Sequence, residues 1–415
     1  MKRILIIGNY IFGRKYMEHS KRLGYEVILA ATTAEEELSI TEKSNIDYYI
    51  QIDYFREEYS LAKITEFYRK IPFDGVLAGH VFLPSLVNLV SKRLNLPFFG
   101  TEAIKNTTSK EKTREIMKEM EMFEANYFKF SSKDEIIKHK DNLDYPCIVK
   151  PLNGFGSINV ERVNSLDDLL VSFKKHTSNL NYSILGPVFS EQILVEPYIE
   201  GKEFSVESIV EEGNVNSIMI TEKIFNEKFE NVENGHIMPA ISLSNIEEKE
   251  IISYVNKIHK IFDINTGITH TEIKVNNDGI HLIELNPRVG GGFIAEMLSK
   301  VLNVDFYKII IENCIGEKYN QVFKGNGYGY IRFIHAPKKG IFLGFKNIEN
   351  LINDKNFLDM EYKIEPNSLV EKLDDNRGRL ALFAYFNSDN FESVERSVLL
   401  LQRNAKIMMK DDTHA

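Results

Sequence analysis

The first hundred residues alternate between short apolar runs and amphipathic stretches. Apolar runs at residues 2–8, 26–30 and 74–79 each have the length and composition of a strand. Helical periodicity predicts helices over residues 12–23 and 84–94. Because strands and helices follow one another in turn, we expect a parallel sheet that is covered by helices on both faces.

Glycine turns follow two of these predicted strands, at Gly8 and at Gly79. Ligands of parallel sheets bind beyond the carboxyl ends of the strands, so both turns are candidates for a surface that faces substrate. An equally good interpretation is that the glycines only permit tight turns. Gly8 and Gly13 have GxxxxG spacing, which differs from the GxGxxG pattern of dinucleotide-binding turns.

A stretch in the second half of the chain alternates between apolar and polar residues on both sides of Asn-Asp-Gly, which predicts a β-hairpin. The loop is predicted at residues 277–279, which places residue 276 opposite residue 280. By the same count Glu272 faces Glu284. The predicted polar face carries His270, Glu272, Lys274, Leu282, Glu284 and Asn286, and the predicted core face carries Ile273, Val275, Ile283 and Leu285.

Two carboxylates directly opposite each other repel, and this arrangement normally destabilises a sheet. A divalent cation between Glu272 and Glu284 would reverse that effect, and oxygen ligands suit Mg²⁺, with Mn²⁺ as an alternative. Asn286 adds a neutral oxygen and Arg288 a positive charge beyond the metal. The alternative is a solvated hairpin face with incidental acids. The three glycines that follow Asn-Pro-Arg-Val favour the metal site, Glu272, Glu284 and Asn286.

Residues 145–151 form another predicted strand, which ends in Lys150-Pro151. A glycine-rich turn and a strand over residues 158–162 follow it. Glycines allow the backbone of such a turn to approach phosphate oxygens closely. The P-loop spacing is missing, so this is not a P-loop. An ordinary hairpin is the alternative, but Lys-Pro before the glycines favours a phosphate site.

The bulk composition limits the classes of function. The chain has 415 residues, enough for two or three domains, and a formal net charge of −9, which argues against a broad nucleic-acid-binding surface. No apolar run reaches membrane-spanning length and the start shows no signal peptide, so we expect a cytoplasmic protein without membrane or nucleic-acid partners. The two cysteines, Cys147 and Cys314, fit buried thiols in a reducing compartment.

Thr-His-Thr-Glu272, followed by Glu284-Leu-Asn-Pro-Arg-Val-Gly-Gly-Gly, resembles the metal-binding end of the ATP-grasp superfamily. More closely it resembles the bacilysin-type L-amino acid ligases, which join two amino acids at the expense of ATP. The stretch Glu233-x-Gly-His236-x-x-Pro-Ala is similar to the same ligases. The resemblance implies an α/β chain with the α+β ATP-grasp fold. Its implied domains are an N-terminal α/β domain at residues 1–105, an ATP-grasp domain at 106–320 with a lid at about 125–196, and a C-terminal domain at 321–415.

The resemblance also implies where ATP binds. Lysines contact the phosphates, the glycine turn closes over them, backbone groups of a hinge read the adenine edge, and Glu203 binds the ribose hydroxyls. Lys110 is the first of these lysines, and Lys112 is a nearby candidate for the same role. The alternative for both is a lysine that is only exposed to solvent and binds no nucleotide. The implied nucleotide residues are Lys110, Lys150, Gly154, Gly156, Ser157, Glu196, Tyr198, Ile199 and Glu203.

On the substrate side, a carboxylate such as Glu233 suits an α-ammonium group, and His236 could bind a carboxylate or take a proton. Arg288 supplies fixed positive charge, and the backbone at Gly291 can approach a developing oxyanion. A surface loop with a lone histidine is the alternative for His236. The four implied catalytic residues are Arg288, His236, Glu233 and Gly291.

The sequence therefore predicts a dipeptide-forming ligase that works through an aminoacyl phosphate and releases ADP and phosphate. Its expected partners are amino-acid substrates, and its expected assembly is a homodimer. Two alternatives stay open: an ATP-grasp carboxylate ligase that acts on a non-amino-acid acid or amine, and a non-catalytic ATP-binding protein.

Overall fold

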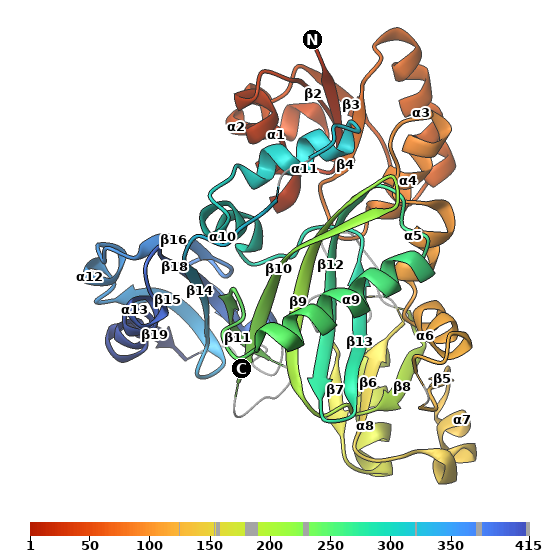
Figure 1. Ribbon diagram of the computed structural model, residues 1–415, viewed down its shortest axis with the longest axis vertical. Helices are drawn as coiled ribbons and strands as arrows, with labels where there is room; N and C mark the ends of the chain where they lie inside the picture. The colour runs from red at the N-terminus through yellow and green to blue at the C-terminus, as the bar shows by residue number, and fades with distance from the viewer. Residues whose placement is uncertain are drawn as a thin grey trace.

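The structure is a computed structural model of the chain, and it describes residues 1–123, 125–152, 154, 158–178, 190–226, 232–319, 322–370 and 376–411. Two of the predicted nucleotide residues, Gly156 and Ser157, lie outside the described residues. Within that part of the chain the strands form four sheets with helices packed around them (Figure 1). None of the described helices is both long and apolar enough to span a membrane.

The N-terminal sheet is parallel, with the strand order β3-β2-β1-β4. Its strands are β1 Arg3–Ile7, β2 Glu26–Ala31, β3 Tyr48–Gln51 and β4 Gly75–Ala78. The helical segments around it are α1 Ile11–Arg22, η1 Glu35–Glu37, α2 Ile40–Ser44, α3 Glu57–Lys70, α4 Pro84–Arg93 and α5 Thr101–Thr108. The predicted parallel α/β arrangement of this segment is therefore confirmed.

Close backbone contact explains the glycines at the ends of these strands. The Gly13 amide donates a hydrogen bond to the Gly79 carbonyl oxygen at 3.2 Å. A Cβ atom added at Gly13 would lie only 1.9 Å from the Gly8 carbonyl oxygen. The three glycines therefore have a packing role, because the helix start and the two strand ends could not otherwise meet.

An eight-stranded sheet forms the centre of the molecule, with the order β13-β12-β9-β10-β11-β14-β18-β16 (Figure 1). Its strands are β9 Lys202–Glu211, β10 Asn214–Phe225, β11 Glu233–Met238, β12 Gly267–Asn276, β13 Gly279–Asn286, β14 Tyr328–His335, β16 Phe357–Tyr362 and β18 Arg379–Asn387. Helix α9, Asn245–Ile261, covers one face, where Ile251 and Val255 pack with Phe204 and Ile273. The polar side chains described below lie on the opposite face.

A smaller antiparallel sheet, with the order β5-β8-β6-β7, lies beside the β12–β13 end of the central sheet (Figure 1). Its strands are β5 Phe128–Phe130, β6 Cys147–Pro151, β7 Glu161–Val163 and β8 Ile193–Pro197. The helical segments next to it are α6 Lys110–Glu119, α7 Lys133–Lys138, η2 Lys140–Asn142 and α8 Leu166–Ser178. The Ser109 hydroxyl caps helix α6 by accepting a hydrogen bond from the Lys112 amide.

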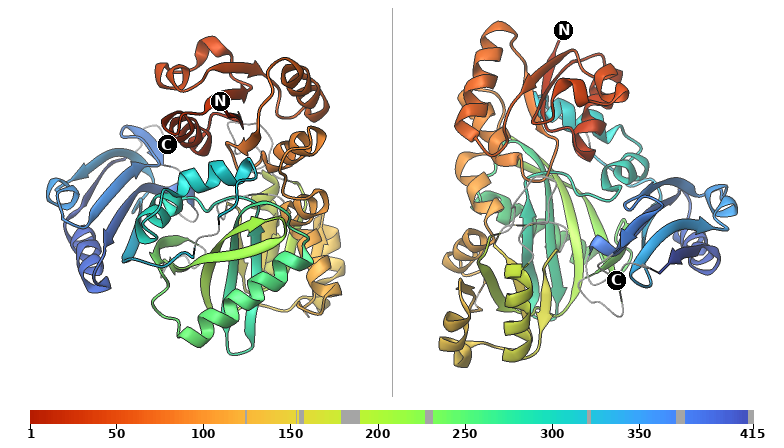
Figure 2. Two further views of the ribbon diagram at one scale, coloured as in Figure 1. Left: turned by 45° about the horizontal axis from the view of Figure 1, so that its top comes forward. Right: turned by 180° about the vertical axis from the view of Figure 1, so that it is seen from behind.

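A three-stranded sheet with the order β17-β15-β19 lies in the C-terminal part, away from the β12–β13 end (Figure 2). Its strands are β15 Gly340–Lys346, β17 Ser368–Val370 and β19 Lys406–Lys410. The remaining described helical segments are α10 Ile294–Val301, α11 Phe306–Cys314, α12 Glu349–Ile352, η3 Asn376–Gly378 and α13 Phe391–Asn404. Helices α10 and α11 join the parts of the molecule, because Leu298 and Ile310 share one core with Ile4 and Met17 of the N-terminal segment and Phe333 of the central sheet.

The β12–β13 hairpin confirms the predicted pairing of Glu272 with Glu284, but it reaches that register differently. The loop is one residue shorter than predicted, because Asn276 pairs with Gly279 instead of residue 280. A bulge compensates, because Glu272 pairs with Glu284 while the next residue, Ile273, pairs with Leu282.

The bulge also corrects the predicted faces of two residues. Leu282 is buried in an apolar core together with Leu285, although it was predicted on the polar face. Ile283, predicted on the core face, lines the same cavity as Glu284. A two-residue periodicity cannot hold through a bulge, because the extra residue shifts every side chain before it to the other face.

Candidate functional site

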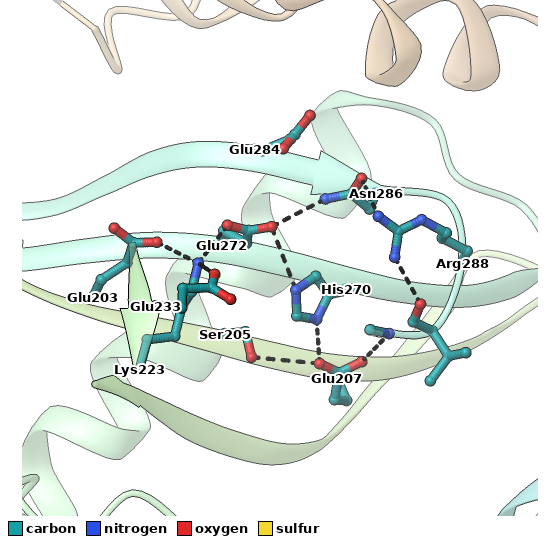
Figure 3. A network of polar contacts seen from close by, with 12 residues as sticks. Glu203, Ser205, Glu207, Lys223, Glu233, His270, Glu272, Glu284, Asn286 and Arg288 are labelled. Carbon is teal, nitrogen blue, oxygen red and sulfur yellow. Dashed lines mark hydrogen bonds and ion pairs between the residues drawn. The ribbon is translucent and has the colours of Figure 1, made fainter. Parts of the chain in front are cut away.

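Polar side chains from neighbouring strands lie together on the face of the central sheet opposite α9 (Figure 3). The strand register produces this arrangement, because Glu207 pairs with His270, Ser205 pairs with Glu272, and Lys223 pairs with His236. Cross-strand partners point to the same face of a sheet. The alternating polar positions of β9, β10, β11, β12 and β13 therefore converge on one surface.

The opposed carboxylates Glu272 and Glu284 are each paired with a lysine from a different part of the fold. The Lys223 ammonium lies 2.7 Å from Glu272, and the Lys110 ammonium at the start of α6 lies 3.1 Å from Glu284. The structure therefore brings together Lys110, Glu272 and Glu284, which lie far apart in the sequence. The lysines offset the repulsion between the two acids.

Lys223 was not predicted from the sequence as a site residue, yet its ammonium lies among three carboxylates. Glu203 lies 2.5 Å, Glu272 2.7 Å and Glu233 2.9 Å from its nitrogen (Figure 3). Burial opposes the charge on Lys223, but the three acids outweigh burial and raise its pKa well above the usual value. Burial favours the neutral form of Glu233, but Lys223 outweighs it and lowers the pKa of that carboxyl. Lys223 therefore connects predicted ribose, metal and substrate residues.

His270 connects the metal candidate Glu272 with the glycine run. Its Nδ1 contacts the buried Glu207, and its Nε2 lies 3.4 Å from Glu272. Glu207 in turn accepts a hydrogen bond from the Gly290 amide at 3.3 Å (Figure 3). Burial would lower the pKa of His270, but Glu207 and Glu272 outweigh it and raise the value to about 9. A charged histidine therefore lies between two carboxylates.

Arg288 and Asn286 lie at the end of the hairpin, and Arg288 bends back on the chain. One guanidinium nitrogen donates to the Val289 carbonyl oxygen at 2.9 Å and another to the Asn286 side-chain oxygen at 3.2 Å. The Asn286 side-chain nitrogen lies 3.4 Å from Glu272. The amide oxygen predicted to bind metal therefore faces Arg288 and must turn towards Glu272 to act as a ligand.

A buried ion cluster joins the smaller sheet to the hairpin. Arg114 of α6, which is only 1% exposed, contacts both carboxylate oxygens of Glu196, at 2.8 and 3.1 Å. It also donates to the Leu282 and Ile283 carbonyl oxygens beside the bulge, at 2.9 and 3.2 Å. One side chain thus holds β8 and β13 together.

Lys150, at the end of β6, contacts Glu196 from the other side. Burial favours the neutral form of Glu196, but its two cations outweigh burial and lower the pKa of the carboxyl to about 2. Burial and the neighbouring Arg114 hold the pKa of Lys150 at about 8, although Glu196 opposes them. The lowered pKa of Glu196 and the lowered pKa of Lys150 both reflect a buried cluster in which two cations contact one carboxylate.

A cavity of about 140 Å³ lies between the smaller sheet and the hairpin, and most of the predicted nucleotide residues line it. The lining residues are Lys110, Ile148, Lys150, Pro151, Gly154, Ile158, Val160, Arg162, Glu196, Pro197, Tyr198, Ile199, Phe225, Glu203, Glu272, Lys274, Ile283 and Glu284. Two of the backbone groups predicted to bind the adenine edge already form hydrogen bonds within the protein. The Tyr198 amide donates to the Pro146 carbonyl oxygen at 3.0 Å, and the Ile199 carbonyl oxygen accepts from Lys274 at 2.9 Å.

The predicted substrate residues lie on the other side of Lys223. His236 Nε2 lies 3.6 Å from Glu233, and burial lowers the pKa of His236. Arg379 of β18, which was not predicted from the sequence as a site residue, lies 3.4 Å from Glu233. Gly291 is exposed and lines a cavity of about 400 Å³ between α1, the glycine run and β16.

The donor set fits Mg²⁺ only in combination with a substrate. Among the described residues, no three His, Cys, Asp or Glu side chains are arranged as metal ligands. Mg²⁺ commonly binds through one or two carboxylates together with substrate phosphates, so two opposed acids beside a lysine-lined cavity suit it. In the structure, the ammonium groups of Lys223 and Lys110 form ion pairs with Glu272 and Glu284, respectively.

A family profile described as an ATP-grasp domain matches residues 143–296, which include strands β6, β7 and β8 of the smaller sheet, the hairpin and the glycine run. The chain therefore carries an ATP-grasp domain, and the predicted ATP-grasp fold is confirmed.

Individual proteins resemble the chain over different lengths. The crystal structure of the L-amino acid ligase from Bacillus licheniformis is 20% identical, has a TM-score of 0.83 and covers 99% of both chains. A second similar structure is the biotin carboxylase domain dimer of the Hydrogenobacter thermophilus 2-oxoglutarate carboxylase, solved with MgADP, ADP and bicarbonate. It is 16% identical, has a TM-score of 0.71, and covers 98% of this chain and 91% of that one. These likenesses show the fold.

In sequence, the chain resembles the large chain of carbamoyl phosphate synthase from Thermoanaerobacter sp. (strain X514). The two are 23% identical over 269 residues, which are 64% of this chain and 24% of that protein. The chain thus spans about a quarter of the length of that relative.

Proposed function

We propose that this protein is an ATP-dependent ligase that joins two L-amino acids into a dipeptide and releases ADP and phosphate. The observation that carries the proposal is a shared lysine. Lys223 contacts both Glu272, a candidate metal ligand, and Glu233, a candidate ligand for an amino-acid ammonium group. One side chain thus connects the place for phosphoryl transfer with the place for an amino acid. The ATP-grasp domain and the fold shared with an L-amino acid ligase support this function.

ATP is proposed to bind in the cavity between the smaller sheet and the hairpin. Lys110 and Lys150 would contact its phosphates, and the backbone at Gly154 would lie close to them. The backbone from Glu196 through Tyr198 to Ile199 would read the adenine edge, and Glu203 the ribose hydroxyls. Glu203 also has Lys223 as a partner, so ribose binding would draw on the same ion cluster.

Glu272, Glu284 and Asn286 would hold Mg²⁺, with Mn²⁺ as an alternative. When it is bound, the metal supplies positive charge to the phosphate oxygens. The surrounding lysines fix the two carboxylates before the nucleotide arrives. Because positioned charge costs no reorganisation during the reaction, this arrangement suits phosphoryl transfer.

The first step forms the aminoacyl phosphate. A carboxylate oxygen of the first amino acid attacks the γ-phosphorus, and the bond from that phosphorus to the bridging oxygen breaks, so that ADP leaves. Arg288 would hold the carboxylate and Glu233 the ammonium group, because each forms a charge-assisted hydrogen bond with its partner. The position of the first amino acid is thereby fixed at both ends.

The second step forms the peptide bond. The neutral amine of the second amino acid attacks the carbonyl carbon, and backbone donors at Gly291 would stabilise the developing oxyanion. The carbon–oxygen bond to phosphate then breaks, and phosphate leaves with the bonding electron pair. His236 would take the proton from the amine, since its lowered pKa keeps the imidazole neutral near pH 7.

Phosphate release from ATP and Mg²⁺, measured over a matrix of amino-acid pairs with mass detection of products, tests this function. The expected result is equal amounts of ADP, phosphate and a dipeptide for particular pairs. Turnover only with a non-amino-acid acid or amine would indicate a different ATP-grasp carboxylate ligase. ATP binding without turnover would indicate a non-catalytic protein. The homodimer and the cytoplasmic location stay predictions.

A further inference from the structure

Among the described residues, buried nitrogen atoms without hydrogen-bond partners gather on three neighbouring strands of the central sheet. They are Nε of Arg379, both ring nitrogens of His335 and both ring nitrogens of His236. Arg379 on β18 and His335 on β14 are cross-strand partners, so their side chains start from adjacent positions. Buried polar groups are normally paired, so a cluster of unpaired polar nitrogens in one place indicates a missing partner.

Phe333 forms the floor beneath this cluster. The Arg379 guanidinium lies 3.7 Å from the centre of the Phe333 ring, and the His236 ring contacts the same ring edge to face at 5.0 Å. A Cβ atom added at Gly292 would lie 3.2 Å from Phe333, so the glycine run passes directly beside it. The cluster therefore borders the proposed site of peptide-bond formation.

The charges of the cluster favour an anion. Arg379 contacts the carboxylate of Glu233, and Lys223 contacts the same carboxylate at 2.9 Å. Glu233 therefore has a second cation as its partner, and it leaves some of the N–H donors of Arg379 unused. Arg379 also donates to the Asn376 side-chain oxygen at 2.8 Å. Burial, with nearby Arg379 and Arg332, lowers the pKa of His335 to about 3, so this histidine is a neutral donor. A carboxylate matches a planar guanidinium and a neutral imidazole N–H.

We propose that Arg379 and His335 bind the carboxylate of the acceptor amino acid. The proposal rests on the proposed function and makes it more specific, since it requires an acceptor with an acid group rather than a simple amine. An α-amino acid carries its amine one carbon away from its carboxylate. An acceptor held at Arg379 therefore keeps its amine close to Glu233 and the glycine run, where the aminoacyl phosphate would form.

Three acceptors separate this role from a structural one. Hydroxylamine traps the activated first amino acid as a hydroxamate and carries no carboxylate. The second acceptor is an amino acid, and the third is the amide of that same amino acid. In the native protein, kcat/KM should be higher for the acid than for its amide, and hydroxamate should form with ATP and the first amino acid.

Arg379→Met keeps the contact with Phe333 and leaves Lys223 paired with Glu233. We expect kcat/KM for the acid to fall by about 30-fold or more, as for other losses of a buried charged partner. The amide and hydroxylamine should react almost as before, so the preference for the acid disappears. Arg379→Lys should restore part of that preference, and His335→Leu should weaken it in the same direction. Arg332→Met is the matched control, because Arg332 lies next to Phe333 in β14 and points to the opposite face.

Several results would overturn the proposal. An equal loss for the acid, its amide and hydroxylamine in Arg379→Met would show a structural role or a role towards the first amino acid. A matching loss in Arg332→Met would show a general effect of charge. A native protein that forms hydroxamate but does not distinguish the acid from the amide would also contradict it. A native protein that forms no hydroxamate with any amino acid would instead contradict the proposed function itself.

Discussion

Glu272 and Glu284 face each other across β12 and β13, and each is paired with a lysine from a different element. Lys223 comes from a strand of the central sheet, whereas Lys110 comes from the first turn of α6. Lys110 is also a proposed ligand of the phosphates, and Lys223 also contacts Glu233, the proposed ligand of the ammonium group. When nucleotide and metal bind, the two lysines would exchange some of their contacts with Glu272 and Glu284 for contacts with the ligands. The site residues lie together before the ligands bind.

Glu284→Gln tests the metal assignment. The change removes one of the two carboxylates at almost constant shape, so Mg²⁺-dependent ADP formation should fall by about 100-fold or more. The fold should stay intact, because the substitution also removes a repulsion within the hairpin. Asp278→Asn, in the exposed turn of the same hairpin, is the control and should keep full activity. Turnover like that of the native protein in Glu284→Gln would exclude Glu284 from a metal site.

Lys150→Ala tests the nucleotide assignment. Because Glu196 keeps both contacts with Arg114, the smaller sheet should still fold, while ATP affinity should fall by about 30-fold or more. Affinity for amino acids should change little. Calorimetric titration of ATP into the variant, compared with Lys129→Ala on the exposed side of β5, measures the effect. Equal ATP affinities in the two variants would remove Lys150 from the site.

Arg114→Met should destabilise the protein by about 3–5 kcal/mol, because it leaves Glu196 and two backbone carbonyl groups without a buried partner. The double variant with Glu196→Gln should lose less than the two single losses combined, since neither charge of the pair then remains. Urea unfolding gives the free energies. A loss below about 1 kcal/mol in Arg114→Met would contradict the role of Arg114 in holding β8 to β13.

His259 predicts a pH dependence of stability away from the site. It is buried between the Val255 carbonyl and the Thr269 hydroxyl, each at 2.7 Å, and burial lowers its pKa to about 4. The unfolded chain has a histidine pKa of about 6.5, so it binds more protons between those values and stability rises with pH there. Below about pH 6.5 the folded state should lose up to about 3 kcal/mol.

Urea unfolding of the native protein and of His259→Gln, from pH 4.5 to pH 7, measures this contribution. The difference in unfolding free energy between the two proteins should grow in favour of the variant as pH falls. A constant difference across the range would show that His259 does not titrate as expected.

The hairpin shows how far the sequence alone could predict the site. Alternation and the Asn-Asp-Gly turn correctly indicated that Glu272 faces Glu284. The shorter loop and the bulge at Ile283 escaped prediction. At the bulge, Arg114 donates to the carbonyl oxygens of Leu282 and Ile283, and strand alternation does not indicate such a contact. A local pattern cannot reveal a partner that lies 168 residues away.

Lys223 and Arg379 were missed for a related reason. Each occupies a polar position in or beside a strand, and such residues usually face solvent. Their importance comes from strand order, which places β10 beside β9 and β11, and β18 beside β14. Three strands of the parallel N-terminal sheet, β1, β2 and β4, were in contrast predictable because each is marked by a local apolar run, whereas β3 was not predicted.

Oxygen-18 transfer tests the central claim, an aminoacyl phosphate formed from the first amino acid, most directly. The first amino acid carries oxygen-18 in its carboxylate, and the protein turns over with ATP, Mg²⁺ and a second amino acid. The account predicts that each released phosphate gains one labelled oxygen and that ADP is the nucleotide product, because the attacking oxygen leaves with phosphorus. Unlabelled phosphate, or AMP in place of ADP, would contradict it.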